Sequence, residues 1–354
     1  MKATISKYNV INHIIGFIFI LMALTDILSS KELKLAAALL SIGAFVLFFS
    51  MKDRNYFTES MLFILFILTT SLINLFFTDN NFGGSLTLFG SLILSFIYFQ
   101  TDNKKMTLWV VASYLITILF ISYHLFVLET NANLIYEGLS RNHAGFAVVF
   151  WTIFLMFHLK IAYNYFPLLP PLIGVTLAFF LFGRTSLIVS FLLLLVVFFY
   201  KFKSNNKARA FAIILLGAVF YYLWVQYGSL LSTETNLGEG LDTPRWELWQ
   251  IYFDHINFIN FFTGIDVSTL PLYDIYSGNP HNSFIKFHSR VGIGSIVFII
   301  LFFVSLFKYL KAKQYYVFWL LILLTIRASF DGDMFIGNFD FIFLIATFYW
   351  IKTD

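Results

Sequence analysis

The sequence is dominated by apolar segments that are each about as long as a lipid bilayer is thick. A helix needs about 20 apolar residues to cross the roughly 30 Å hydrocarbon core of a membrane. By that measure the chain contains about twelve candidate spans, near residues 10–28, 35–51, 61–77, 82–99, 107–128, 143–163, 166–183, 185–200, 210–227, 285–307, 315–330 and 336–351. Single segments of this length satisfy their backbone hydrogen bonds within a membrane only as helices. We therefore expect an all-α polytopic membrane protein that forms one integral membrane domain over residues 1–354.

The composition excludes a soluble protein with an ordinary core. Of the 354 residues, 59% are hydrophobic and only 12% are charged, whereas a soluble domain has about 25% charged residues. The chain contains no cysteine, which excludes disulfides, thiol catalysis and cysteine-ligated metals. The first apolar run lacks a small-residue cleavage site, so we expect a retained helix rather than a signal peptide. The net charge of +4 comes mainly from short basic loops, so it does not indicate nucleic-acid binding.

Lysine and arginine are distributed differently along the predicted spans. With both termini in the cytoplasm, 15 of the 23 basic residues fall on the cytoplasmic side, as the positive-inside rule requires for an inner-membrane protein. Of the seven arginines, only Arg54 and Arg209 follow that rule. The other five fall at or near the outer face: Arg141, Arg184, Arg245, Arg290 and Arg327. Because the guanidinium group grips phosphate with a planar fork of donors, this distribution predicts a phosphate-bearing ligand on the outer side.

Residues 228–284 form the only long interruption between the apolar spans, and we expect an extracytoplasmic loop that forms part of an active site. Within it, Thr243 can cap a helix and Pro244 favours the first helical position. Arg245 would then lie in the first turn of an aromatic, interfacial helix that runs to about Phe262. The helix N-terminus would assist Arg245 in binding an anion. The alternative is a surface ion pair between Arg245 and a neighbouring acid.

The loop ends at His281, which is our candidate for a catalytic base. It precedes Asn282 and Ser283, either of which can cap the helix of the tenth predicted span. Asn282, Lys286 and Arg290 are spaced by four residues and fall on one face of that helix. A histidine titrates near neutrality and can take a proton from a sugar hydroxyl. The alternative is a satisfied polar residue at the membrane surface, an interpretation that we favour for the deeper His288.

Four further residues at the outer face are candidates for ligand contact. Arg184, in LFGRTSL, either snorkels to the interface or binds phosphate. Arg141 and His143, in LSRNHAGF, lie where the chain re-enters the membrane. Arg327 is four residues before Asp331, so it either forms an ion pair or binds a ligand. No two histidines have the spacing of a helical zinc site, so we expect no metal and no cofactor.

These stretches resemble sequences of the O-antigen polymerase and ligase superfamily of bacterial membrane enzymes. The similar stretches are RNHAGF, LFGRTSLIVSFLLLL, TPRWELWQ followed by FFTGID, and HNSFIKFHSRVGIG. Their order and spacing are shared from about residue 140 to 310, whereas the first 130 residues match only in being hydrophobic. One departure is His143, where the family more often has asparagine and proline.

The resemblance implies a metal-independent, inverting glycosyltransferase on the outer leaflet. Its donor would be a polyprenyl-pyrophosphate-linked glycan, with Arg184 and Arg245 holding the pyrophosphate and His281 activating the acceptor hydroxyl. Lys286 and Arg290 are added from helix geometry alone, as further donor-binding residues beside Arg141. Asn282, His143 and Arg327 would contact the acceptor or support the site.

The sequence fits three specific functions: a polymerase, a ligase and a flippase. A polymerase adds its glycan to another lipid-linked repeat unit, sometimes with a chain-length regulator as partner, whereas a ligase adds it to a lipid core or protein. We favour the polymerase. A flippase for lipid-linked oligosaccharides also fits about twelve spans, but it predicts two similar halves, which the sequence does not show.

Overall fold

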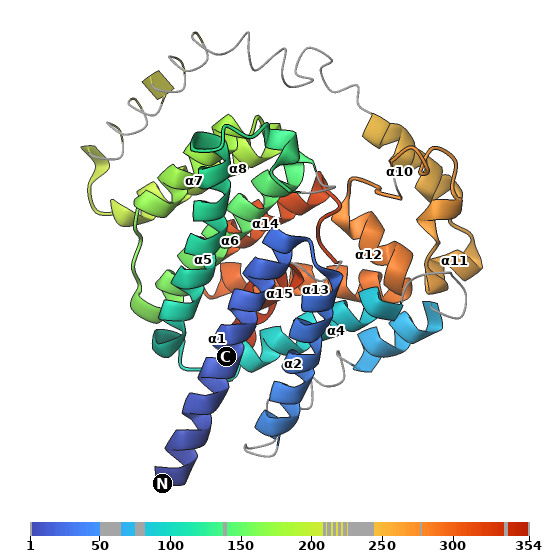
Figure 1. The fold of residues 1–354 in the computed structure, drawn as a ribbon, viewed down its shortest axis with the longest axis horizontal. Coiled ribbons are helices and arrows are strands. Elements are labelled where there is room, and N and C mark those ends of the chain that lie inside the picture. The colour runs from blue at the N-terminus through green and yellow to red at the C-terminus, as the bar shows by residue number, and fades with distance from the viewer. Residues whose placement is uncertain are drawn as a thin grey trace.

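The computed structural model describes residues 2–49, 65–74, 82–136, 140–207, 244–276, 278–335 and 339–352, together with isolated positions between 210 and 225. These ranges contain helices and turns but no strand, which confirms the all-α class. The helices are α1 (Lys2–Leu28), α2 (Lys31–Phe49), α4 (Phe82–Gln100), α5 (Asn103–Phe126), α6 (Arg141–Tyr163), α7 (Leu169–Phe180), α8 (Arg184–Lys201), α10 (Pro244–Asp254), α11 (Phe258–Thr263), α12 (Ser283–Val291), α13 (Ile293–Lys311), α14 (Tyr315–Ser329) and α15 (Asp340–Phe348) (Figure 1).

Five of the described helical segments are long and apolar enough to cross a membrane: Val10–Leu28, α5, α6, α8 and α13. Shorter apolar helices cover Leu65–Asn74, Gly84–Phe99, α7 and α14. The protein is therefore a helical, multi-pass membrane protein. A total of twelve spans stays a prediction, because the expected spans 61–77 and 210–227 lie partly outside the described residues.

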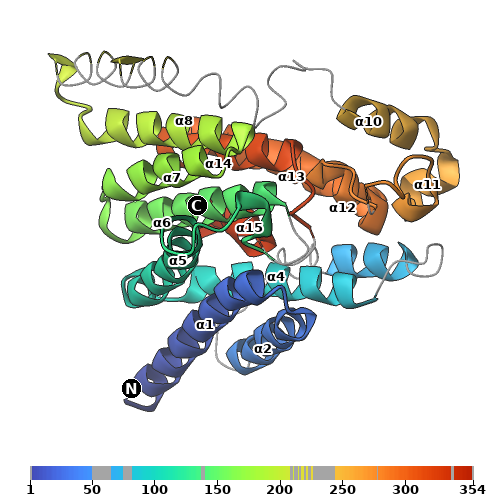
Figure 2. The same ribbon diagram turned by 45° about the horizontal axis from the view of Figure 1, so that its top comes forward.

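Helix α6 is the centre of the bundle. Its side chains are buried without interruption from His143 to His158, and it packs against α5, α7, α8 and α14. Figure 2 shows α5, α6, α7 and α8 stacked beside one another, whereas α10 and α11 lie at the periphery. A helix that is apolar on every side lies either in a protein core or in lipid; the neighbours of α6 place it in the core of the bundle.

The structure differs from the sequence prediction at the last expected span, 336–351. Here the α-helical part, α15, has nine residues, about 14 Å of helix, and continues directly into the short 3-10 helix Tyr349–Lys352. All nine residues are buried, with α4, α6, α13 and α14 around them. Its apolar composition therefore reflects contact with protein rather than with lipid.

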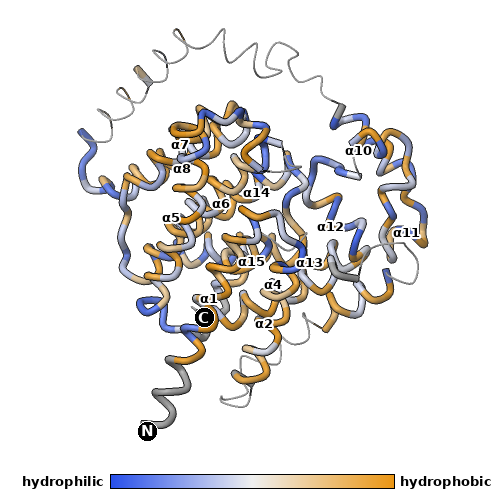
Figure 3. The backbone as a smooth tube through the Cα atoms, viewed as in Figure 1, coloured by the Kyte–Doolittle hydropathy of each residue, from blue (hydrophilic) through white to orange (hydrophobic). Residues whose placement is uncertain are grey.

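The tenth expected span, 285–307, is divided into α12 and α13 at Gly292, which has a left-handed φ of 50°. The expected helix from Pro244 to Phe262 is likewise divided into α10 and α11. Figure 3 shows that hydrophilic segments gather around α10 and α12, in contrast to the apolar α5 and α15. The predicted interfacial loop therefore contains described helices, and its residues 228–243 lie outside the described part.

The two ends of the bundle carry different cations. Lys104 begins α5, Lys160 ends α6 and Lys201 ends α8. These ends lie together, because the Phe166 ring after α6 packs against Tyr200 of α8 and Tyr316 of α14. The opposite ends of the same helices carry arginines, at the start of α6, at the start of α8 and near the end of α14: Arg141, Arg184 and Arg327. The chain reversals thus separate the ends of these helices that carry lysines, the lysine end, from the ends that carry arginines, the arginine end. Lys34 and Lys286 also lie at the arginine end.

Close backbone contact at Gly292 joins α11, α12 and α13. A Cβ atom at this position would overlap the carbonyl of Phe262. The carboxamide of Asn74 donates hydrogen bonds to the carbonyls of Thr263 and Ser289, the second at 3.0 Å. Because only glycine combines a left-handed φ with the absence of a side chain, this residue permits the break between α12 and α13.

We predict that Gly292→Ala destabilises the protein. A left-handed alanine costs roughly 1–2 kcal/mol, and its methyl group would also overlap Phe262. The thermal unfolding midpoint in detergent should therefore fall. Gly43→Ala is the matched control, because nothing lies within 4 Å of a Cβ at Gly43 in α2, and alanine is the better helix former. Equal effects of the two substitutions would contradict the close contact.

Candidate functional site

A group of charged residues collects at the arginine end of the bundle, and we call it the charged cluster. It comprises residues from the end of α1, the start of α6, the end of α14, the turn after α14, and α12: Asp26, His143, Arg327, Asp331, Asp333, Lys286 and Arg290. Ionisable groups in a membrane protein are costly, and they usually pair with one another. The residues of the charged cluster pair with one another or bond to backbone carbonyls.

The imidazole of His143 bridges two carboxylates from distant parts of the chain. Its Nε2 lies 2.6 Å from Oδ1 of Asp26, and its Nδ1 lies 3.3 Å from Oδ1 of Asp333. The hydroxyl of Tyr136 donates a hydrogen bond of 3.3 Å to the other oxygen of Asp26. The contact of Nε2 with Asp26 is a hydrogen bond, whereas that of Nδ1 with Asp333 is a charge pair by distance alone. A carboxylate on each side of the ring favours the charged imidazolium. His143 therefore ties α1 and the turn after α14 to α6.

Arg327 forms the ion pair that the sequence spacing indicated. Its Nη2 donates to Oδ2 of Asp331 at 3.1 Å and also to the carbonyl of Asn142 at 2.7 Å. Its side chain is only 2% exposed, so it belongs to the interior rather than to the interface. The same guanidinium thus connects the end of α14 to the start of α6.

Three side chains of α12 hold the turn after α14. The hydroxyl of Ser283 donates to the carbonyl of Asp331 at 2.6 Å. Lys286 donates from Nζ to the carbonyl of Gly332 at 2.9 Å, and Arg290 donates from Nη1 to the carbonyl of Phe335 at 3.1 Å. The expected common face of Lys286 and Arg290 is therefore present, and it contacts the backbone of this turn.

Asn282 is the N-cap of α12, as expected. Its side-chain oxygen accepts hydrogen bonds from the backbone N–H groups of Phe284 and Ile285, at 2.9 and 3.2 Å. These bonds satisfy two of the free donors at the helix start. They also use the oxygen that would otherwise contact an acceptor.

The pKa values of the two acids in the turn, Asp331 and Asp333, are shifted in opposite directions. Burial raises the pKa of Asp331, and the charge of Asp333 raises it further, against the opposing effect of Arg327. Burial also acts to raise the pKa of Asp333, but His143 and Arg327 outweigh it and lower that pKa to about 2. Asp333 is therefore ionised at neutral pH.

His281 lies beside the charged cluster in a strained conformation. Its φ is 49°, a region that non-glycine residues rarely adopt, and its N–H donates to the side chain of Asn279 at 2.9 Å. Within the described part of the chain, the buried Nδ1 of His281 has no hydrogen-bond partner. A buried polar atom left without a partner is uncommon, and it marks this nitrogen as a place where a ligand could bond.

The ring of His281 is neutral at pH 7. Burial lowers its pKa below the ordinary 6.5; Asp331 raises it, and Arg245 and Lys286 lower it. A neutral imidazole can accept a proton. The electrostatics therefore agree with the role expected for this residue.

Arg245 occupies the first turn of α10, as the sequence predicted. Burial lowers its pKa, Asp331 raises it, and Arg327 and Arg184 lower it again. Arg245 thus lies within electrostatic range of two other guanidinium groups and one carboxylate. Several guanidinium groups within electrostatic range of one another suit a multiply charged anion.

Other expected residues lie elsewhere or have structural partners. Arg141 lines a separate hollow near the end of α5. The Nδ1 of His288 lies 2.6 Å from the hydroxyl of Tyr252, and its Nε2 lies 3.2 Å from the carbonyl of Phe261. His288 therefore joins α12 to α10 and α11, which agrees with its interpretation as a satisfied polar residue.

Two acids of the charged cluster, Asp26 and Asp333, were not predicted as site residues from the sequence, and Asp331 was considered only as a partner of Arg327. Asp26 stands at the end of the first apolar run, and Asp331 and Asp333 flank Gly332 after the eleventh. An acid at the end of an apolar span is itself a signal, because such residues are rare in membrane proteins and often functional. Among the described residues, no group of three or more histidines and acids is arranged to hold a metal ion.

No protein-family model, curated protein or solved structure matches the chain significantly. An inference about function therefore depends on the geometry of the charged cluster and its neighbours.

We predict that His143→Ala destabilises the protein by about 3–5 kcal/mol, because removing one partner leaves buried carboxylates without compensation. Unfolding in mixed micelles measures this change. The double variant His143→Ala/Asp26→Asn should regain part of the lost free energy of unfolding, since Asp26→Asn removes one of the two unpaired charges. The control is His255→Ala at an exposed position, which should change the free energy of unfolding by less than about 0.5 kcal/mol. If His143→Ala were as mild as this control, the bridge would not stabilise the fold.

Proposed function

We propose that the protein is a membrane glycosyltransferase that polymerises polyprenyl-pyrophosphate-linked oligosaccharide repeat units into a surface polysaccharide. The observation that supports this proposal is the buried Nδ1 of His281, which has no hydrogen-bond partner among the described residues, near Asp331 and its ion-pair partner Arg327. The charges of Arg184 and Arg327 both act on Arg245, whose charge acts on His281. A cationic site next to a neutral base has the two groups that glycosyl transfer from a pyrophosphate donor requires. The sequence resemblance to polymerases and ligases supports the same reaction.

The distribution of cations supports a location on the outer leaflet. The lysine end of the bundle carries Lys104, Lys160 and Lys201, and the positive-inside rule assigns such an end to the cytoplasm. The arginine end would then face outward. Lipid-linked repeat units assembled inside the cell would meet the enzyme after their transfer across the membrane.

In the proposed reaction, the acceptor hydroxyl attacks the anomeric carbon of the donor sugar from the face opposite the pyrophosphate. The new C–O bond forms as the bond from the anomeric carbon to the phosphate oxygen breaks, so the configuration inverts. Nδ1 of His281 accepts the hydroxyl proton, and polyprenyl pyrophosphate leaves with both electrons of the broken bond. Arg184 and Arg245 stabilise the charge that develops on this leaving group.

The other residues of the charged cluster would hold these groups in place. Arg327 positions Asp331, whose negative charge lies close to both His281 and Arg245. Lys286 and Arg290 fix the turn through its carbonyls and add positive charge for the donor. Positioning of this kind contributes to the rate because transfer requires aligned reactants.

A flippase is the second candidate, and one observation favours it. The bridge from Asp26 through His143 to Asp333 is buried, and chains of ionisable residues at membrane depth occur in proton-coupled transporters. A transporter would move the lipid-linked repeat unit without changing it. The product of the reaction therefore separates the two functions.

The test is incubation of the purified protein with a lipid-linked repeat unit as its sole substrate. A polymerase converts it into a ladder of longer lipid-linked glycans, which gel electrophoresis resolves. A product that forms only after addition of a lipid core or a protein acceptor would identify a ligase instead. An unchanged substrate under both conditions would contradict glycosyl transfer, and transfer of the lipid across a vesicle membrane would then identify the flippase.

We predict that the acidic limb of the pH–rate profile lies below pH 6.5, because burial, Arg245 and Lys286 lower the pKa of His281. Arg245→Gln removes a neighbouring cation, so the pKa should rise and the limb should move to higher pH. Asp331→Asn removes a carboxylate that favours the imidazolium form, so the limb should move to lower pH. Measurements of kcat/KM against pH, with NMR titration of the ring protons, follow both shifts.

The control for these shifts is Glu247→Gln, at an exposed position of α10, which should leave the midpoint unchanged. If neither Arg245→Gln nor Asp331→Asn shifted the midpoint of the acidic limb, another group would be the base.

A further inference from the structure

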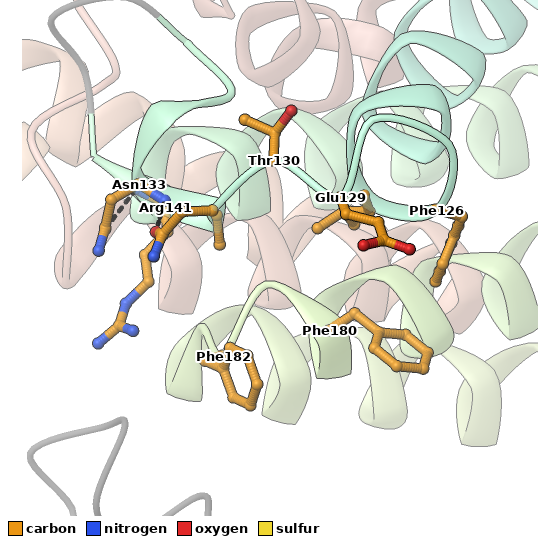
Figure 4. Close-up of a pocket in the computed structure, with 10 residues that line it drawn as sticks. Phe126, Glu129, Thr130, Asn133, Arg141, Phe180 and Phe182 are labelled. Atoms are coloured by element: carbon orange, nitrogen blue, oxygen red, sulfur yellow. Dashed lines mark hydrogen bonds between the residues drawn. The ribbon is translucent and has the colours of Figure 1, made fainter.

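A hollow of about 320 Å³ lies at the arginine end of the bundle, between the end of α5, the turn that follows it, and the turn between α7 and α8. Figure 4 shows that Glu129 and Arg141 extend from one side and that the rings of Phe180 and Phe182 form the other. The volume is near the lower limit of the range of about 300–1,000 Å³ typical of small-ligand sites. It therefore suits a short ligand rather than a long lipid chain.

The lining of the hollow combines aromatic faces with donors and acceptors. Phe126 and Phe180 are 49% and 43% exposed, and their rings pack edge to face with centroids 5.0 Å apart. The carboxylate of Glu129, the carboxamide of Asn133 and the guanidinium of Arg141 also line it. A pyranose ring has a C–H face that packs on aromatic rings and a rim of hydroxyls that both donate and accept hydrogen bonds. The lining offers a partner for each of these features.

Local contacts hold this lining in place. The side chain of Asn131 caps the short helix Ala132–Leu134 by accepting from the N–H of Asn133 at 2.9 Å. Asn133 in turn accepts from the backbone N–H of Arg141 at 3.4 Å, so the turn is joined to the start of α6. A site whose walls are ordered before binding loses less entropy when a ligand arrives.

Two residues of the lining have strained backbones. Glu129 has a φ of 50° and Phe182 a φ of 53°, although side chains disfavour this region. Such strain persists where the surrounding structure fixes it, and it is frequent at ligand sites. Here the two strained residues, Glu129 and Phe182, belong to different turns and line the same hollow.

Both walls of the hollow continue directly into the proposed catalytic site. Arg141 is followed by Asn142, whose carbonyl accepts a hydrogen bond from Arg327. Phe182 is two residues before Arg184, whose charge acts on Arg245. The hollow is therefore lined by residues that adjoin, in the chain, residues of the candidate site.

We infer that this hollow is a saccharide subsite that holds one or two pyranose units of the glycan next to the site of transfer. This inference rests on the proposed function for the identity of the glycan, but the hollow itself is defined by its own residues. It gives Arg141 a role as a sugar-binding residue, distinct from the pyrophosphate-binding role of Arg184 and Arg245.

The test uses the full protein in phosphatidylcholine nanodiscs with two soluble probes. The first probe is a panel of neutral disaccharides and trisaccharides of glucose, galactose and N-acetylglucosamine, with binding measured by saturation-transfer NMR. The second is inorganic pyrophosphate, with binding measured by calorimetry. The wild-type protein should bind at least one saccharide, and saccharides should not compete with pyrophosphate.

Glu129→Ala and Phe180→Ala should each weaken saccharide binding by about 10-fold or more, because a charged hydrogen bond or a ring contact is lost. Neither should change the affinity for pyrophosphate. The matched controls are Asp274→Ala and Phe258→Ala, exposed positions outside the hollow, which should bind both probes normally. An unchanged thermal unfolding midpoint shows that the variants are folded.

The outcomes separate the subsite from the proposed function. Absence of saccharide binding to the wild-type protein, or equal binding by the hollow variants and the controls, would overturn the subsite. Displacement of saccharides by phospholipid acyl chains would also overturn it and identify a lipid site. Arg184→Lys and Arg245→Lys should weaken only pyrophosphate binding, since lysine lacks the planar fork of donors. If they do not, the proposed donor site fails while the saccharide subsite stands.

Discussion

An imidazole between two carboxylates joins three parts of this protein that the sequence places far apart. His143 belongs to the central helix α6, whereas Asp26 ends α1 and Asp333 lies in the turn after α14. Buried charges are stable only when they are paired and hydrogen-bonded, so each of these residues requires the other two. The bridge fixes the turn that carries Asp331, and Asp331 in turn lies beside Arg327, Arg245 and His281. The geometry of the candidate site thus depends on this interaction, together with the hydrogen bonds from α12 that hold the same turn.

The surrounding helices explain how such a site can exist in an apolar chain. Antiparallel connections bring the starts of α6 and α8 to the same end as the close of α14. Gly292 allows α12 to break from α13 and turn its polar face toward the loop after α14. Lys286 and Arg290 then donate hydrogen bonds to backbone carbonyls of that loop. Cations are therefore collected at one end without exposing them to hydrocarbon.

Features encoded locally could be predicted from the sequence. The apolar runs predicted helices, and Pro244 predicted the start of α10. Asn282 was one of two predicted caps, and an ion pair was one of two roles that the spacing of Arg327 and Asp331 indicated. Each of these depends on residues within one or two helical turns of each other.

Tertiary features could not be predicted in this way. An apolar run does not distinguish a span from a buried helix such as α15. The break at Gly292 depends on the approach of Phe262, and the partners of His143 come from separate elements. The strained turn residues of the saccharide hollow, Glu129 and Phe182, follow no local rule either.

The most direct test of this account is a cryo-electron microscopy structure of the protein in a nanodisc with a lipid-linked oligosaccharide. The account predicts density for the pyrophosphate between Arg184 and Arg245, with the first sugar facing His281 and the glycan directed toward Glu129 and Arg141. A pyrophosphate bound at the lysine end of the bundle, or an empty arginine end in the presence of saturating lipid, would contradict it.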